Sequence, residues 1–346
     1  MPVKVKKGDK PIKQEPTIYE IAKITGVSAS TVSRVINNYP YVQKETRAKV
    51  LKALSENNYV QNDTARSLVT QASKLVGILI ADVRTTHHTD GVYYIEHELS
   101  RYGYSTIIYN TGTDPDTQAK YLQTLSQRRV DAVVLMGSVY QNNSVQNAIM
   151  VYLPNTPVAI CNGYLDGKNI YGVISDEKTG VADAVKLLVS KGRKHFAFIT
   201  DHYTPSNYMK LDGFNLGLKL YAQDPVTYTS VVVEAGDDVS QIQDATTKLV
   251  QSNPNIDAII FADDFVALAG LHALVELGIK IPQEISVIGL NNSRYASISN
   301  PALTSIDNML YDTSLIAVRN LLEVLKGERV NHKISISTVI VERSTT

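Results

Sequence analysis

The chain has 346 residues, which is long for a single domain and predicts two or three folded units. Its apolar content of 44% and charged content of 20% exclude a chain that is disordered throughout. The single cysteine, Cys161, excludes an internal disulfide and fits a reducing compartment. No apolar run approaches the roughly 18 residues of a membrane span, and the Lys-rich start lacks the apolar stretch of a secretory signal, so we expect a cytoplasmic protein.

The net charge of +0 conceals an asymmetry along the chain. Residues 1–70 carry 12 Lys and Arg against 6 Asp and Glu, whereas the remaining residues carry 22 against 28. A basic end on an acidic body is typical of proteins that bind a polyanion. Chance or a solubilising tail would produce the same imbalance, so charge alone does not decide between these interpretations.

The first two segments in chain order differ sharply in composition. Residues 1–16 are rich in lysine and proline and have almost no large apolar side chains, which predicts a disordered basic tail. Residues 17–61 predict a domain of three short helices. The first helix begins at a capping box formed by Thr17 and Glu20 and ends at Gly26.

The second and third helices follow from similar signals. Ser28 is a suitable N-cap for a helix that continues to Asn37. A third helix is expected from Gln43 to Asn57. Its apolar side chains have a spacing that predicts burial; they are Val50, Leu51 and Leu54.

Segment 17–38 has the layout of a helix-turn-helix, whose second helix enters the major groove of DNA. Arg34 can make a bidentate contact to guanine, which is worth roughly 1–3 kcal/mol of discrimination between bases. Hydroxyl side chains can bind phosphates or bases, and Ala29 can meet a thymine methyl group. An ordinary three-helix subdomain is the alternative. The candidate DNA contacts in this helix are Ser28, Ala29, Ser30, Thr31, Ser33, Arg34 and Asn37.

Residues 62–73 are predicted to be a hinge helix and linker. Asn62 or Asp63 can cap a helix that runs to about Val69. A helix this short is marginal alone, because isolated helices below roughly 12–15 residues rarely persist in water. We therefore expect it to need a second copy of itself and DNA to become stable.

From residue 74 onward, apolar runs typical of buried parallel strands alternate with helical segments. Eight such runs are LVGILIADV (75–83), STIIYN (105–110), VDAVVLMG (130–137), PVAICN (157–162), HFAFIT (195–200), SVVVE (230–234), DAIIFA (257–262) and ISVIGL (285–290). A break near Tyr171 divides them into two series. We predict an α/β core over 74–346 made of two doubly wound parallel-sheet lobes, with an all-α helix-turn-helix head in front of it.

The predicted lobe boundaries follow from that break. The first lobe is expected to comprise about 74–170 and 304–330, and the second about 171–303 and 331–346. The last segments are expected to cross between the lobes; they are LTSI (303–306), a helix over 311–326 and ISISTVIVE (334–342). Ligands of such folds bind beyond the carboxyl ends of the strands, which here is the cleft between the lobes.

The head resembles that of the LacI/GalR family of bacterial repressors. The family pattern T-I-x-D-V-A-x-x-A-G-V-S-x-x-T-V-S-R-V-x-N is matched by TIYEIAKITGVSASTVSRVINN, with conservative departures at Glu20, Ile21 and Thr25. The family's hinge pattern, N-x-x-A-R-S-L, is matched by Asn62, Ala65, Arg66, Ser67 and Leu68. The resemblance adds Asn62, Ala65, Arg66 and Leu68 to the candidate DNA contacts.

The resemblance implies a mechanism as well as a fold. In the family, the hinge leucine wedges into the minor groove at the operator centre and bends the duplex, and Leu68 holds that position. A routine apolar contact in a linker is the alternative for Leu68. The resemblance also implies a homodimer that recognises a pseudo-palindromic double-stranded DNA operator.

The core carries further segments of the family. They are KHFAFIT (194–200), KLDGF (210–214), FADDFVALA (261–269), SVIGLNN (286–292) and NPALTSID (300–307). The core is similar to periplasmic sugar-binding proteins, which implies a small-molecule effector, a sugar or a sugar phosphate, between the lobes. The candidate effector contacts are Asp82, His87, His88, Asp176, Lys210, Asp263 and Asn291.

Several of these positions depart from the family pattern. The usual Arg is Lys210, the usual Asn of A-N-D is Asp263, and two aromatic positions are His87 and His88. With Arg84, these basic groups favour a phosphorylated or carboxylated effector, whereas Asp82 and Asp263 suit sugar hydroxyls. Side chains that merely face solvent or each other are a further alternative. The nature of the effector therefore stays open at the level of the sequence.

Other classes of function have weaker support. A metal site at His87, His88, Asp90 and His97 is disfavoured, because His97 lies about two turns along a helix that starts near Asp90. We expect no cofactor and no catalytic residues, since the chain has no Gly-rich phosphate loop, nucleophile elbow or metalloprotease motif. A transport receptor is opposed by the head and hinge. A repressor, an activator and a corepressor-dependent repressor remain open, as do a dimer and a tetramer.

Overall fold

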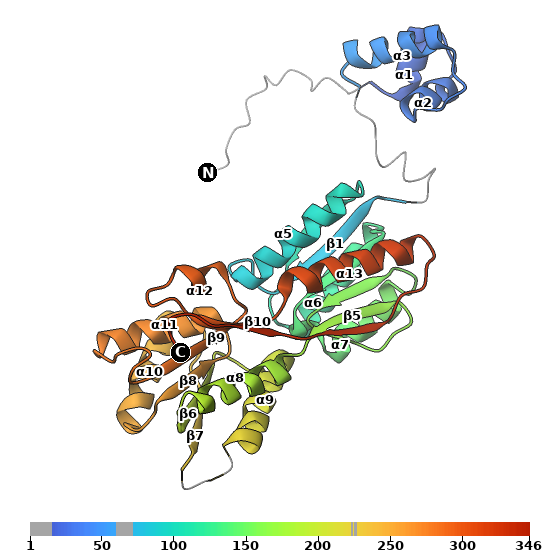
Figure 1. The fold of residues 1–346 in the computed structure, drawn as a ribbon. Helices are drawn as coiled ribbons and strands as arrows, with labels where there is room; N and C mark the ends of the chain where they lie inside the picture. The colour runs from blue at the N-terminus through green and yellow to red at the C-terminus, as the bar shows by residue number, and fades with distance from the viewer. Residues whose placement is uncertain (1–15, 60–71, 223, 225–226) are drawn as a thin grey trace, which may run out of the picture. The chain divides into compact units, whose positions relative to one another are not determined.

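The computed structural model of the chain describes residues 16–59, 72–222, 224 and 227–346. These residues form two separate compact units, Met1–Ser73 and Lys74–Thr346, which we treat one at a time and call the head and the core (Figure 1). The predicted tail (apart from Pro16) and most of the predicted hinge, 62–71, lie outside the described residues. No helix in the described ranges is long and apolar enough to cross a membrane.

The head contains the three predicted helices, α1 (Ile18–Thr25), α2 (Ala29–Ile36) and α3 (Lys44–Glu56). The capping box is confirmed: the Glu20 N–H donates to Thr17 Oγ1 at 3.3 Å, and the Thr17 N–H donates to Glu20 Oε2 at 2.6 Å. Gly26 ends α1 in the left-handed conformation, with φ at 65°, and Ser28 caps α2. The turn between α1 and α2 is therefore built from local side-chain chemistry.

The small core of the head is apolar and gathers one face of each helix. Its buried side chains are Ile21, Ala22, Val32, Val35, Val50 and Ala53. The prediction that Leu51 is buried is wrong, because this side chain is 51% exposed. Val50 and Ala53 define the inward face of α3, and Leu51 lies about 100° around the helix from Val50, on the flank of that face.

The core is built on two six-stranded sheets of the same design. The first has the order β11-β5-β4-β3-β1-β2 and the second β12-β10-β9-β8-β6-β7. All neighbouring strands are parallel except β10 and β12. The strands are β1 (Leu75–Ile80), β2 (Ser105–Asn110), β3 (Ala132–Met136), β4 (Val158–Cys161), β5 (Ile170–Ser175), β6 (His195–Thr200), β7 (Thr229–Glu234), β8 (Ala258–Phe261), β9 (Ser286–Leu290), β10 (Thr304–Asp307), β11 (Lys333–Ile336) and β12 (Val339–Val341).

Helices cover both faces of each sheet, as the continuous apolar strands require. The first sheet packs against α5 and α13 on one face and α6 and α7 on the other, and the second against α10 and α11 and then α8 and α9 (Figure 1). The helices of the first lobe are α5 (Thr86–Arg101), α6 (Pro115–Gln127), η1 (Ser138–Tyr140), α7 (Asn143–Tyr152) and α13 (Leu310–Leu325). Those of the second are α8 (Glu177–Ser190), α9 (Pro205–Tyr221), α10 (Val239–Ser252), α11 (Asp264–Glu276) and the short α12 (Arg294–Ile298).

The predicted lobe boundaries need correction at three strands. β5 pairs with β4 in the first sheet, although we placed residues from 171 onward in the second lobe. β10 pairs with β9 in the second sheet, and β11 with β5 in the first, the reverse of our expectation for 304–307 and 333–336. The supposed break near Tyr171 is itself a buried strand. One of its two partners, β11, lies more than 150 residues away in the sequence, and no local pattern identifies that pairing.

Three connections join the lobes, at 175–177, 307–310 and 336–339, and they lie against one another. The Ser175 hydroxyl donates to the Asn308 carbonyl. The Asp176 N–H donates to the Ile336 carbonyl at 2.8 Å. In Figure 1 the C-terminal segment passes from β11 in one lobe to β12 in the other, as predicted for this end of the chain. The three connections thus form one hydrogen-bonded hinge between the lobes, which differs from the predicted hinge helix over 62–73.

Candidate functional site

The second helix of the head presents a polar, solvent-facing ridge. Val32 and Val35 anchor α2 in the head core, which leaves Ser30, Arg34 and Asn37 exposed on the opposite side. The other predicted contacts are exposed or half-buried; they are Ser28, Ala29, Thr31 and Ser33. No hydrogen-bond or ion-pair partner for the Arg34 guanidinium is found within the described part of the head. The ridge therefore offers several donors to an external ligand.

Hydroxyl groups at the start of α2 are arranged in a local network. Ser28 Oγ accepts from the Thr31 N–H at 3.1 Å and lies 2.8 Å from Ser30 Oγ and 2.9 Å from Thr31 Oγ1. At the other end of the helix, Asn37 Nδ2 donates to the Ser33 carbonyl at 3.0 Å. The first turn thus brings three hydroxyl groups close together, an arrangement that suits a phosphate oxygen.

The head also carries exposed aromatic side chains that the sequence had not indicated. Tyr19 is 75% exposed and Tyr41 87% exposed. Tyr41 contacts Tyr39 edge-on with ring centroids 5.9 Å apart, and Arg47 fixes this loop by donating to Asn38 Oδ1 at 2.7 Å. The hinge candidates Asn62, Ala65, Arg66 and Leu68 lie outside the described residues.

In the core, Lys210 lies on the inner face of α9, and its ammonium reaches the carboxyl end of β8. Its side chain is 7% exposed, and Nζ donates to the Ala262 carbonyl at 2.9 Å and to Asn207 Oδ1 at 3.1 Å. Gly213 sets the position of α9, because a Cβ at this residue would lie 2.3 Å from the Lys178 carbonyl oxygen of α8. The KLDGF segment therefore provides both a buried cation and the close helix contact that positions it.

A buried carboxylate that our sequence analysis missed pairs with this lysine. Glu177 is 1% exposed, and its Oε1 lies 3.9 Å from Lys210 Nζ. Glu177 accepts from Asn162 Nδ2 at 3.2 Å and from the Ser206 hydroxyl. The Ser206 N–H donates to Ser138 Oγ at 3.0 Å. Because Asn162 and Ser138 belong to the first lobe, these contacts bridge the cleft.

Asp263 and Asn291 continue the polar wall of the second lobe. Asp263 caps α11 by accepting from the Phe265 N–H at 2.7 Å, and it accepts from Asn291 Nδ2 at 2.5 Å. Asn291 Oδ1 in turn accepts from Asn308 Nδ2 at 2.7 Å. Burial raises the pKa of Asp263, and the Lys210 ammonium opposes this shift. Asp263 and Asn291 were both predicted, and they are thus joined to the hinge between the lobes through Asn308, a residue that the sequence had not indicated.

The neighbouring carboxylate, Asp264, has a structural role. It is 1% exposed and accepts from Ser305 Oγ and from the Ser293 N–H, each at 2.6 Å. Burial raises its pKa to about 7. These bonds hold the loop after β9 against β10, which supports the position of Asn291.

The first lobe contributes the loop between β1 and α5. Asp82 forms an ion pair with Arg84 at 2.6 Å. Hydrogen bonds from the side chain and the backbone N–H of Arg84 lower the pKa of Asp82 to about 2. His88 Nδ1 lies 3.0 Å from the Asp82 carbonyl, and burial lowers the pKa of His88. Burial lowers the pKa of His87 to about 3, and the nearby His88 and Lys210 add to this effect. His87 is therefore neutral at physiological pH.

The predicted effector residues are only partly brought together. Lys210, Asp263 and Asn291 lie on one polar wall of the second lobe. His87 belongs to the other lobe, and the charge of Lys210 helps to lower its pKa. Asp82 is committed to Arg84. Asp176 caps α8 through the Thr179 N–H at 3.1 Å and lies at the hinge. Among the described side chains, no three His, Cys, Asp or Glu residues lie close enough to hold a metal ion.

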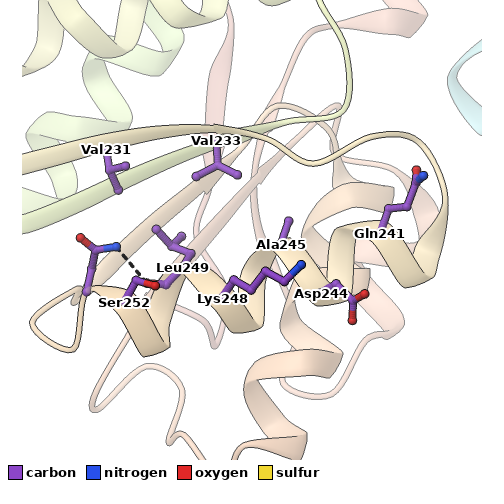
Figure 2. A pocket seen from close by; sticks show the side chains of 9 residues that line it. Val231, Val233, Gln241, Asp244, Ala245, Lys248, Leu249 and Ser252 are labelled. Carbon is purple, nitrogen blue, oxygen red and sulfur yellow. Dashed lines mark hydrogen bonds between the residues drawn. The ribbon is translucent and has the colours of Figure 1, made fainter.

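A second hollow lies away from these residues, on the outer edge of the second lobe. Figure 2 shows Ala245 and Leu249 of α10 pointing toward Val231 and Val233 of the edge strand β7. The groove has a volume of about 480 Å³. None of the predicted effector residues lines it. This groove is therefore not the effector site that the sequence predicted.

Comparison with known proteins agrees with both units. Residues 17–62 match the family of bacterial regulatory proteins, lacI family, and residues 185–346 match a periplasmic binding protein-like domain. An HTH-type transcriptional regulator of Lachnoclostridium phytofermentans is 34% identical over 95% of this chain and 99% of its own. The ribose operon repressor of Bacillus subtilis is 30% identical over 90% of this chain and 92% of its own.

A solved structure described as a lac repressor dimer bound to operator and an anti-inducer has the same fold. It superimposes with a TM-score of 0.84 at 23% identity, covering 96% of this chain and 99% of that chain. The relatives are regulators of transcription and not enzymes. With the exposed helix-turn-helix ridge and the two-lobed core, these similarities show that the chain is a DNA-binding transcriptional regulator that belongs to the lacI family of bacterial regulatory proteins.

Proposed function

We propose that this regulator is a cytoplasmic repressor of a carbohydrate-utilisation operon. It binds a pseudo-palindromic operator as a homodimer, and a small molecule in the inter-lobe cleft controls it. The observation that carries the proposal is the combination of an uncommitted recognition ridge on α2 with a cleft whose polar groups span two hinged lobes. The similarity to a ribose operon repressor and to an operator-bound repressor dimer supports it.

On DNA, α2 lies in the major groove with its first turn against the phosphates. Arg34 contacts a guanine, while the hydroxyls of Ser28, Ser30 and Thr31 bind phosphate or base edges. Ala29, Ser33 and Asn37 complete the surface. The exposed rings of Tyr19 and Tyr41 lie on the same unit and are further candidates for backbone contacts.

The linker couples the two units. A short helix beginning near Asn62 becomes stable when two copies meet at the operator centre, where Ala65 and Arg66 approach the minor groove and Leu68 wedges between base pairs. Rotation of the lobes about the hinge changes the separation of the two linkers. Replacing Leu68 with Ala should therefore reduce DNA bending, and unchanged bending would refute the wedge.

The cleft favours a neutral polyhydroxyl effector over a sugar phosphate. Arg84 pairs with Asp82 and is 87% exposed, so it points largely to solvent. Lys210 is bonded to two oxygens and faces Glu177. With its pKa near 3, His87 brings no positive charge. The Asp263 carboxylate lies on the same wall as Lys210, and its oxygens can accept hydrogen bonds from the hydroxyl groups of a sugar. His88, Asn291 and Asp176 border the same cleft or its hinge.

Two measurements test the proposal. Selection of duplexes from a randomised pool with the full-length protein should enrich a pseudo-palindrome, and retention should fall steeply with salt because phosphate contacts release counterions. No enrichment, with or without candidate sugars, would contradict operator binding. Thermal unfolding with ribose and, as the matched anion, ribose 5-phosphate separates the effector classes. Stabilisation by the phosphate alone would contradict the neutral effector and leave operator binding intact.

A further inference from the structure

The core begins at Lys74, the residue directly before β1, and the predicted linker joins the core there. The φ of Lys74 is 54°, in the left-handed region that residues other than glycine rarely adopt. Of the described non-glycine residues with a positive φ, all but Lys74, Arg129 and Met309 are asparagine, which tolerates this conformation better. A lysine keeps such a conformation only where its surroundings determine it, so the contacts of Lys74 need an explanation.

Three contacts hold Lys74, through its N–H, its carbonyl and its side chain. The N–H donates to Asp131 Oδ2 at 2.9 Å, and the carbonyl accepts from the Ser105 N–H at 2.8 Å. The ammonium lies 4.0 Å from the centre of the Tyr104 ring, which is a cation–π contact. The Tyr104 side chain itself packs against the apolar core of the first lobe. Backbone and side chain of Lys74 are thus both fixed, and we call these four residues the linker clamp.

The linker clamp lies at the edge of the first sheet that is opposite to the effector cleft. Lys74, Ser105 and Asp131 stand at or directly before the first residues of β1, β2 and β3. His87 and Ser138, which belong to the cleft, follow the carboxyl ends of β1 and β3. Because β1, β2 and β3 are parallel neighbours in one sheet, the clamp moves as one body with the first lobe.

The direction in which a linker leaves the core matters to a dimer that reads two half-sites. Each base pair added between the half-sites moves them apart by about 3.4 Å and turns one relative to the other by about 35°. A linker that can leave the core in any direction can follow such a change, whereas a linker with a fixed direction cannot.

We propose that Lys74 is a positioning residue that fixes the direction in which the linker leaves the core, and thereby the half-site spacing that this regulator accepts. The inference rests on the proposed function, since it needs a homodimer on a pseudo-palindromic operator. Asp131 and Tyr104 act through Lys74. Rotation of the first lobe redirects the linker at this residue and so carries the state of the cleft to the heads.

Competition binding to operators of different spacing tests the proposal with the full-length protein. The probes are the enriched pseudo-palindrome and the same sequence with one or two base pairs added or removed at its centre. We expect the wild type to lose about tenfold in affinity at each altered spacing. Lys74→Gly should lose only about two- to threefold, because glycine permits the left-handed conformation but brings no ammonium and turns more freely. Lys74→Arg, which keeps a cation over the ring, should behave as the wild type.

Lys186→Ala is the matched control, because the Lys186 ammonium lies over the Tyr221 ring at 5.7 Å in the second lobe. Its dependence on spacing should equal that of the wild type. The proposal would be overturned if Lys74→Gly kept the dependence of the wild type, or if Lys186→Ala lost it to the same extent. A loss of affinity in Lys74→Gly that is the same at every spacing would also overturn it, because that is the effect of a merely structural role.

Hydrogen exchange without DNA separates this inference from the proposed function. The Ser105 amide, which donates to the Lys74 carbonyl, should exchange about tenfold faster in Lys74→Gly and in Asp131→Ala than in the wild type. Exchange as slow as in the wild type would overturn the linker clamp, whether or not an operator is found. An enriched operator whose spacing preference survives Lys74→Gly would overturn the role of Lys74 alone. Failure to enrich any operator would instead contradict the proposed function, and the role in spacing with it.

Discussion

The head and the inter-lobe cleft both carry clusters of polar side chains, but they hold them in opposite ways. On α2, Arg34 and Ser30 face solvent, and Arg34 has no partner among the described residues of the head. In the cleft, Lys210 and Glu177 are buried and Asp263 is half-buried, and each is bonded to one of the others or to a close neighbour. An exposed cation needs no internal partner because water solvates it, whereas a buried one must be compensated.

This difference indicates how each site meets its ligand. A polyanion brings its own charges to the head, so contact there adds to a surface that is already stable. A small molecule entering the cleft must instead replace contacts that the lobes make with each other, such as Ser206 with Ser138. A ligand of the cleft therefore competes directly with contacts between the lobes, whereas a ligand of α2 displaces no internal contact of the head. Four changes in sequence test this contrast.

The largest effect is expected at Lys210. Replacing it with Met keeps the volume but leaves Glu177 and Asp263 without their cation, and breaking such a buried pair costs about 3–5 kcal/mol. Urea denaturation should show this loss in the core, and the response to effector should disappear. Lys219→Met, at an exposed position of the same helix, is the control. Equal stability of the two variants would show that the cleft charges are solvated after all.

Asp264→Asn should remove a pH-dependent change of about a few kcal/mol in the free energy of unfolding of the core. The pKa of Asp264 is raised from 3.8 to about 7, so the folded state binds this proton more tightly than the unfolded chain. Its contribution to stability is therefore complete below about pH 4 and is lost as the pH rises through about 7. Asn keeps an acceptor for the Ser293 N–H and a donor toward Ser305.

Denaturation curves from about pH 4 to about pH 8 measure this effect. The free energy of unfolding of the variant, relative to that of the wild type, should rise as the pH increases across this range. His87 contributes the opposite slope, because its pKa is lowered to about 3, but it does so in both proteins. A difference that stays flat with pH would mean that Asp264 is ionised throughout.

On the head, Arg34→Ala should remove roughly 1–3 kcal/mol of discrimination at one base pair of each half-site. Because Arg34 lies on the exposed ridge, the stability of the protein and its affinity for the effector should not change. Competition binding to single-base operator variants measures the preference. Lys52→Ala on α3, whose exposed side chain pairs with Glu56 at 3.7 Å, should at most weaken binding to all sequences equally.

The smallest effect concerns the fold of the head itself. Thr17→Ala removes the cap of α1 and should cost about 1 kcal/mol, whereas Thr17→Ser should retain it. Hydrogen exchange of the α1 amides reports this free energy directly. Identical exchange in the Ala and Ser variants would show that Glu20 alone holds the turn. The core should be unaffected in both.

Much of this molecule follows from local patterns in the chain. The caps at Thr17 and Ser28, the three head helices and all eight predicted strands are present, because helix signals and apolar runs act within a few residues of one another. The exposure of Leu51 was missed, since neighbouring positions on a helix are only 100° apart and packing decides which one faces inward.

Tertiary structure alone decided which sheet each crossover strand joins and which partner each cleft side chain finds. β11 pairs with β5 and β12 with β10, although two residues separate β11 from β12. Glu177 and Asn308, which no motif had indicated, hold Lys210 and Asn291 in place. Pairing across long sequence separations depends on the whole chain burying its apolar surface at once, and that condition leaves no local trace.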